Sequence, residues 1–127
     1  DKTAELVLKA KEVLSFEAIV QTGLSGASVA FPVSYITGIP VVSVRKNSDY
    51  NHGYQIEGYG NFESYAILDD MIDSGDTINR VINTLNGFSK PKCTGLIFWN
   101  ANVTTDQIKF RLNLAKIDLP FYTLSEA

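Results

Sequence analysis

The sequence predicts an α/β fold: a five-stranded, mainly parallel sheet with helices on both faces and one long flexible loop. Apolar segments with the period of a strand alternate along the chain with segments that have the period of a helix. Neither repeats nor low-complexity segments interrupt this alternation. Such an order implies parallel strands joined by right-handed crossovers, with the connecting helices on both faces of the sheet.

Size and charge narrow the class of protein. The chain has 127 residues, 45% of them hydrophobic, which suits one domain with a single core over residues 1–127. The net charge of -3 offers no basic field for nucleic acid, and no polybasic tract or long apolar run suits a membrane. Cys93 is the only cysteine, so we expect no internal disulfide and a reducing compartment, the cytoplasm.

The first elements alternate clearly. Residues 3–14 have the spacing of an amphipathic helix, and "FEAIVQ" (16–21) follows as a short apolar strand. After the turn "TGLSGAS" we expect a helix over 26–37, with Pro32 in its first turn or at a kink. The segment "IPVVSVRK" (39–46) is rich in β-branched residues and predicts a second strand.

The middle of the chain contains the long loop. Residues 47–63 are polar and glycine-rich, and a connection of this length predicts a mobile functional loop. The segment "SYAILDD" (64–70) predicts a third strand. A helical period then ends at Gly87, a suitable cap, and "CTGLIFW" (93–99) predicts a fourth strand.

The last third is ambiguous in one segment. In "TTDQIKFRLNLAKI", Ile108 and Phe110 alternate with polar residues as in a strand, whereas Thr104 and Gln107 have the spacing of a helical capping box. We favour the helix. The segment "LPFYTL" (119–124) predicts the fifth strand.

Ligands of parallel sheets bind at the carboxyl ends of the strands. The segments with unusual composition all fall at that edge of the predicted sheet: 22–28, 46–62, 69–77 and 99–102.

The stretch "YAILDDMIDSGDT" predicts a phosphate site. Residues 73–77 pass from a strand into a helix, where backbone N–H groups and the positive end of the helix dipole attract an anion. Gly75 permits a close approach. Asp69 and Asp70, at the strand's end, can accept hydrogen bonds from vicinal sugar hydroxyls or hold Mg²⁺ through water. The spacing therefore fits a ribose 5-phosphate, and the alternative is an acidic turn with a helix cap.

These motifs resemble a known family. The segment "ILDDMIDSGDT" resembles the 5-phosphoribosyl-1-pyrophosphate (PRPP) signature of type I phosphoribosyltransferases, with Ala66 where a larger aliphatic residue is usual. The similarity continues upstream through "IVQTGLSGASVAFPVSYITGIPVVSVRK" (19–46), including "GIPVVSVRK", and altogether covers residues 16–88.

The resemblance implies an enzyme that joins a nucleobase to ribose 5-phosphate in nucleotide salvage and releases pyrophosphate, with Mg²⁺ as cofactor. It implies that Asp69 and Asp70 engage the ribose hydroxyls and the metal, and that Asp73 is the general base. An aspartate at this position favours a purine over orotate. The implied loop for the 5'-phosphate comprises Asp73, Ser74, Gly75, Asp76 and Thr77.

The resemblance also implies a pyrophosphate site. The loop "TGLSGAS" would bind pyrophosphate through backbone amides, with a cis peptide between Leu24 and Ser25; an ordinary glycine turn is the alternative. Arg45 and Lys46 match a basic pair near the pyrophosphate or form a solvated strand end, and His52 lies on the closing loop or is a surface residue. The implied pyrophosphate residues are Gly23, Leu24, Ser25, Gly26, Arg45, Lys46 and His52.

Base binding is expected after the fourth strand. Trp99 can stack on a purine and Asn100 can read its polar edge, although Trp99 also suits the edge of the core. Little chain is left for the hood that covers the base in the family. We expect PRPP and a nucleobase as ligands, and a homodimer.

Three departures from the family pattern leave another function open. Ser25 and residues 47–51 lack the usual cations, and Asp76 adds a negative charge beside the phosphate loop. A non-catalytic regulatory module that binds PRPP or a nucleotide is therefore the alternative, together with an orotate-type enzyme. A partner subunit of a dimer can also supply the cation.

Overall fold

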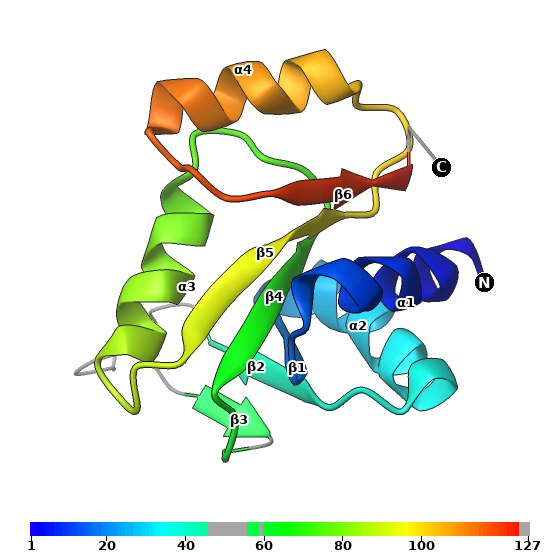
Figure 1. The fold of residues 1–127 in the computed structure, drawn as a ribbon, viewed down its shortest axis with the longest axis vertical. Coiled ribbons are helices and arrows are strands. Elements are labelled where there is room, and N and C mark those ends of the chain that lie inside the picture. The colour runs from blue at the N-terminus through cyan, green and yellow to red at the C-terminus, as the bar shows by residue number, and fades with distance from the viewer. Residues whose placement is uncertain (46–55, 59, 125–127) are drawn as a thin grey trace.

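The structure is a computed structural model that describes residues 1–45, 56–58 and 60–124, without the side chain of Leu24 (Figure 1). The elements in chain order are α1 (Lys2–Leu14), β1 (Ala18–Gln21), α2 (Gly23–Thr37), β2 (Val41–Val44), β3 (Ile56–Gly58), β4 (Ser64–Asp69), α3 (Asp76–Asn86), β5 (Lys92–Phe98), α4 (Thr105–Ala115) and β6 (Phe121–Thr123). No helix in these ranges is long and apolar enough to cross a bilayer.

The strands form one sheet in the order β3-β2-β1-β4-β5-β6. The five predicted strands are all present and pair in parallel, so the predicted α/β class is confirmed. The predicted strand number is wrong by one, because β3 pairs antiparallel with β2 inside the stretch expected to be a loop. Strand β3 was not predicted because its three residues are too few to show the alternation of a strand in a polar, glycine-rich stretch.

Each face of the sheet carries its own half of the core. Helices α1 and α2 lie on one face and α3 and α4 on the other, as predicted (Figure 1). Successive strand residues alternate between the faces: Ile19, Leu68 and Ile97 join the α1/α2 side, and Val20, Ile67 and Phe98 join the α3/α4 side. Because both faces are buried, the central strands contain long apolar runs.

The ambiguous segment in the last third is a helix. Thr104 Oγ1 accepts from the N–H of Gln107 at 3.2 Å, and Gln107 Oε1 accepts from the N–H of Thr104 at 2.9 Å, so the capping box is present. Ile108 and Leu112 are buried while Phe110 is exposed, which is the pattern of a helix and not of a half-buried strand.

Two expectations for α2 are wrong. The helix begins at Gly23, which has a φ of 83°, and Pro32 lies in the helix interior and not in the first turn. Residues 23–26 therefore form the first helical turn, and there is no cis peptide in the described backbone, Leu24–Ser25 included. A helical turn explains the difference, because its i to i−4 hydrogen bonds require trans peptides.

A pair of titratable side chains, the buried Tyr65 and the half-buried Cys93, lies between β4 and β5. Tyr65 and Cys93 are register partners, and the Tyr65 hydroxyl is buried with no hydrogen-bond partner among the described residues. Burial raises the pKa of Tyr65, and the neighbouring Cys93 raises it further. Burial also raises the pKa of the Cys93 thiol, to about 11, although the carbonyl of Gly95 and the side chain of Tyr65 act in the opposite direction.

This pair predicts an alkaline loss of stability. Both groups hold their protons more tightly in the folded state, so their contribution is complete below the unfolded pKa values and is lost as pH rises through the folded ones. We expect the free energy of unfolding, measured in urea, to fall from about pH 9 to 11 through Cys93, and also above about pH 10 through Tyr65, by up to about 1.4 kcal/mol per pH unit for each group. The double variant Tyr65→Phe/Cys93→Ala should show a shallower fall. An equal slope in both proteins would contradict this prediction.

Candidate functional site

The carboxyl ends of β1, β4 and β5 bring three of the predicted segments, 22–28, 69–77 and 99–102, to one edge of the sheet, and most of the fourth, 46–62, falls outside the described residues. The pairing of β4 with β5 continues past the strand ends, because the N–H of Trp99 donates to Asp69 O at 3.0 Å and that of Asn100 donates to Asp70 O at 3.1 Å. The acidic pair is thus held beside the residues expected to meet the base.

The turn between β4 and α3 encloses a pocket of about 120 Å³. It brings together five of the predicted phosphate and ribose residues. The lining comprises Asp69, Asp73, Ser74, Gly75 and Thr77, with Met71, Ile72 and Ile78 as apolar neighbours. The pocket is of a size suited to one phosphate group and not to a whole nucleotide.

Backbone donors of α3 face this turn. The helix begins at Asp76, and its cap residue, Gly75, has no side chain with which to satisfy the first N–H groups. Ser74 Oγ accepts from the N–H of Asp76 at 3.2 Å. This bond comes from the residue before the cap, and α3 has no side-chain cap hydrogen bond at its start, so the next amides of the first turn are without side-chain caps.

Helix α4 fixes the turn from outside. Gly75 is buried at a φ of 88°, and a Cβ at this position would lie 2.6 Å from the Ala115 Cβ and 3.1 Å from the Ile117 Cδ1. The turn therefore has the conformation and the packing that only glycine permits.

Asp69 and Asp70 are both half-buried, and the N–H of Asp70 donates to Asp69 Oδ1 at 2.8 Å. No group of three or more potential metal-ligating side chains occurs among the described residues. Two adjacent carboxylates nevertheless fit Mg²⁺, which commonly binds one or two carboxylates and completes its shell with water and substrate phosphates.

A larger pocket of about 780 Å³ lies beside the first turn of α2. Three predicted pyrophosphate residues, Gly23, Ser25 and Arg45, line it. Arg45 forms an ion pair with Glu57 of β3, with 3.5 Å between Nε and Oε1. The charged side chains of the described lining therefore compensate one another. Gly26 is buried below this pocket, next to Gln21.

Other predicted residues lie apart from these pockets. The Asp76 side chain lines a separate groove on α3 with Asn79, Arg80, Asn83 and Thr84. Trp99 packs against the core on the α1/α2 side, with a buried indole N–H that has no partner among the described residues. Asn100 Nδ2 lies 3.9 Å from Met71 Sδ. Its role and that of Trp99 in base binding stay predictions.

Comparison with known proteins identifies the fold. No family model matches the chain. An adenine phosphoribosyltransferase of Prochlorococcus marinus is 30% identical over 112 residues, which cover 73% of this chain and 65% of that protein. An adenine phosphoribosyltransferase structure from Saccharomyces cerevisiae matches with a TM-score of 0.70 and 17% identity over 96% of this chain and 74% of its own. The chain has the type I phosphoribosyltransferase fold.

Two further structures show the same phosphoribosyltransferase fold. Leishmania donovani UMP synthase matches with a TM-score of 0.70 and 19% identity over 98% of this chain and 27% of its own. The orotate phosphoribosyltransferase of Aeropyrum pernix matches with a TM-score of 0.65 and 16% identity, over 98% of this chain and 71% of its own. The resemblance predicted from the motifs is confirmed. The chain spans about 65% of the length of its curated relative.

Some of the predicted site residues lie outside the described residues, and some residues that line the observed pockets were not predicted. Lys46, His52, the Leu24 side chain and most of the expected mobile loop fall outside. Gln21, Ser43 and Glu57 line the larger pocket and were not predicted. The sequence offered a signal for Gln21, a polar residue at the end of an apolar strand. It offered none for Glu57, because nothing in the sequence places this residue at a pocket.

The close packing of Gly75 predicts that a larger residue at this position destabilises the protein. Gly75→Ala should lower the free energy of unfolding by about 2 kcal/mol or more, since it combines a positive φ with overpacking against Ala115. Gly38→Ala is the matched control: its φ of 77° is similar, but no atom lies within 4 Å of the new Cβ. We expect it to cost about 1 kcal/mol. Urea unfolding measures both, and equal losses would contradict the packing argument.

Proposed function

We propose that this protein is a PRPP-dependent phosphoribosyltransferase that joins a nucleobase, preferably a purine, to ribose 5-phosphate in nucleotide salvage. The observation that carries the proposal is the pocket at the end of β4, where a helix N-terminus and two hydroxyls face the strand-end carboxylate of Asp69, with Asp70 next to it in the sequence. This arrangement suits a phosphate at one end and a ribose at the other.

The proposed reaction exchanges one bond at the anomeric carbon of ribose. A nitrogen of the base attacks this carbon, and its bond to pyrophosphate breaks with the electron pair leaving on the pyrophosphate oxygen. Asp73, exposed at the pocket, accepts the proton that the base loses. Asp69 and Asp70 accept hydrogen bonds from the ribose hydroxyls and would hold Mg²⁺ through water. Bound Mg²⁺ would supply charge neutralisation for the departing pyrophosphate.

Two observations support a purine. The sequence relative is named an adenine phosphoribosyltransferase, and the yeast structure contains adenine. Asp73 provides a carboxylate base, which the family pattern associates with purines. Orotate is the alternative base, because orotate phosphoribosyltransferases share the fold.

A second function, a regulatory module that binds PRPP or a nucleotide without catalysis, is favoured by one observation. The larger pocket contains Ser25 and a compensated Arg45–Glu57 pair, so its described side chains provide no net positive charge for pyrophosphate. Such a module would keep the ribose phosphate site and lack turnover.

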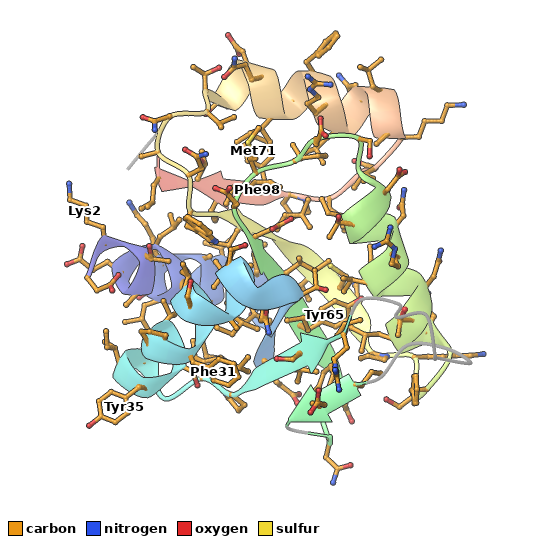
Figure 2. The ribbon with its side chains drawn as sticks, turned by 180° about the vertical axis from the view of Figure 1, so that it is seen from behind. Lys2, Phe31, Tyr35, Tyr65, Met71 and Phe98 are labelled. Carbon is orange, nitrogen blue, oxygen red and sulfur yellow. The ribbon has the colours of Figure 1, made fainter. Side chains whose placement is uncertain are left out.

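We also propose that the chain acts as a homodimer that packs through α2. This helix contains no charged residue, and Phe31, Tyr35 and Ile36 are exposed on it, Tyr35 to 92%. Tyr35 extends away from the body of the molecule (Figure 2). A helix that exposes large apolar side chains and has no charged face is normally covered by another element or chain. A second copy suits this face, because a two-fold axis brings like residues together and uncharged residues do not repel.

Residues 1–127 would act as a single domain with a minimal hood over the base. The cytoplasm is the compartment we propose, because the thiol of the lone Cys93 persists in a reducing environment.

The enzyme proposal predicts two different defects. With PRPP, Mg²⁺ and a panel of adenine, hypoxanthine, guanine and orotate, the wild-type protein should release pyrophosphate with a purine. Asp73→Asn should keep PRPP affinity and lower turnover about 10²-fold or more, since it removes the base. Asp70→Ala should weaken PRPP binding itself, since it removes an acceptor for ribose.

Asp106→Asn is the control for loss of a negative charge, because Asp106 is an exposed acid of α4 outside both pockets. This variant should change neither the affinity for PRPP nor the turnover. A wild-type protein that binds PRPP but releases no pyrophosphate with any base would decide for the regulatory module. Equal turnover by wild type and Asp73→Asn would remove Asp73 as the base, and the purine preference would lose that support.

The dimer proposal predicts that a charge on α2 weakens association. Tyr35→Glu places two like charges near the two-fold axis and should raise the dimer dissociation constant about tenfold or more. Phe110→Glu is the matched control, because Phe110 is a similarly exposed aromatic residue on α4. Sedimentation velocity measures the association. A monomeric wild type, or a dimer insensitive to Tyr35→Glu, would contradict this interface.

A further inference from the structure

Strand β6 forms one end of the sheet, and its outer edge is open. It pairs with β5 on one side, where the N–H of Leu96 donates to Pro120 O at 2.9 Å, and no described strand lies on its other side (Figure 1). Successive residues of a strand direct their backbone N–H and C=O groups to opposite sides. Since Pro120 faces β5, the backbone groups of Phe121 point to the open side and offer a donor and an acceptor to another extended chain.

The two ends of the sheet differ in how the edge strand is protected. Natural edge strands commonly carry charged side chains, which oppose pairing with another chain. At the far end, β3 carries Glu57, whose carboxylate pairs with Arg45. Strand β6 is equally short but has no charged residue, and Pro120 before it faces β5, so its missing N–H does not block the outer side. The edge of β6 is therefore the one that accepts pairing with another chain.

A groove of about 540 Å³ follows this open edge. Helix α1 borders it from one face of the sheet with Lys9, and α4 borders it from the other face with Lys109. Its floor is formed by β6 and the residues before it, and it is mainly apolar, with Leu119, Phe121 and Tyr122 among its members. A groove that runs along a strand edge between two helices suits one added strand.

The charge of this groove is opposite to that of the whole chain. Its described lining contains two ammonium groups, those of Lys9 and Lys109, and no carboxylate, whereas the chain has a net charge of -3. Both lysines are exposed, and neither forms an ion pair with a described residue. Acids of the same helices, Glu5, Glu12 and Asp106, do not line the groove. The groove therefore attracts a segment with negative side chains, and it disfavours the same edge of a second copy, which would bring like charges together.

We propose that the open edge of β6 binds an extended acidic segment of a partner protein as an additional strand of the sheet. The backbone of the segment pairs with Phe121. Because successive side chains of a strand point to opposite faces, two adjacent acidic residues reach Lys9 on the α1 face and Lys109 on the α4 face. Apolar residues beside them cover the floor of the groove. This site uses none of the residues of the proposed reaction.

The test uses a fluorescein-labelled heptapeptide of valine and threonine with two adjacent glutamates at its centre, and fluorescence anisotropy measures its affinity for the full chain. One control peptide has lysines in place of the glutamates, and another has N-methylated central amides, which keep the side chains and prevent backbone pairing. The protein variant is Lys9→Gln/Lys109→Gln. Lys90→Gln/Lys92→Gln is its matched control, because these two lysines are also exposed and lie outside the groove, at the start of β5.

We expect the glutamate peptide to bind the wild type about tenfold or more tightly than either control peptide, and to shift the amide signal of Phe121 in nuclear magnetic resonance spectra. Lys9→Gln/Lys109→Gln should lower this affinity about fivefold or more, while Lys90→Gln/Lys92→Gln keeps it, and equal melting temperatures show that both variants are folded.

Three results would each overturn the proposal: no binding of the glutamate peptide to the wild type, equal affinity for the N-methylated peptide, or an equal loss of affinity in both variants. A Phe121 signal that shifts on dilution of the wild type without any peptide would assign this edge to a second copy of the chain, and would also overturn it.

Discussion

The contact of Gly75 with Ala115 determines where the acid-rich turn lies, and the rest of the candidate site depends on it. The turn leaves β4, passes beneath α4 and starts α3 within a few residues. Because Gly75 has no Cβ, α4 can approach closely enough to bury this residue. The first turn of α3, which follows Gly75, borders the small pocket that Asp69 and Asp73 also line. The packing of the fold at Gly75 therefore positions the turn that lines the small pocket.

The four carboxylates near this turn repel one another less than their spacing in the sequence indicates. Asp69 and Asp73 border the small pocket, whereas the Asp76 side chain lies on a separate groove of α3. Asp69 Oδ1 accepts from the N–H of Asp70, and the positive end of α3 offsets part of the remaining charge. An acidic pocket beside a pocket of balanced charge suits a ligand that arrives with a divalent cation.

The sequence predicted the parts of the fold that depend on local periodicity and on composition. The parallel strands, the amphipathic helices and the capping box of α4 follow from spacing alone, and the phosphate turn follows from an apolar strand that ends in acids and small residues. Strand β3 could not be predicted, because it depends on a partner distant in sequence, β2. The early start of α2 at Gly23 was hidden by two glycines that usually indicate a turn.

Two site features illustrate the same limit. The Arg45–Glu57 pair joins β2 to β3, so it could be found only after the antiparallel pairing was known. The Oε1 atom of Gln21 is buried without a hydrogen-bond partner among the described residues, which depends on what surrounds it and not on its residue type. In contrast, the grouping of Asp69, Asp73, Ser74, Gly75 and Thr77 was predictable, since all five lie within one turn of chain at a strand's end.

The central claim is that the turn after β4 holds a ribose 5-phosphate, and a crystal structure with adenosine monophosphate tests it most directly. The phosphate should lie in the pocket of Ser74, Gly75 and Thr77, within hydrogen-bond distance of the first amides of α3. The ribose hydroxyls should lie against Asp69 and Asp70. A nucleotide bound elsewhere, or one whose phosphate points away from this turn, would contradict the account.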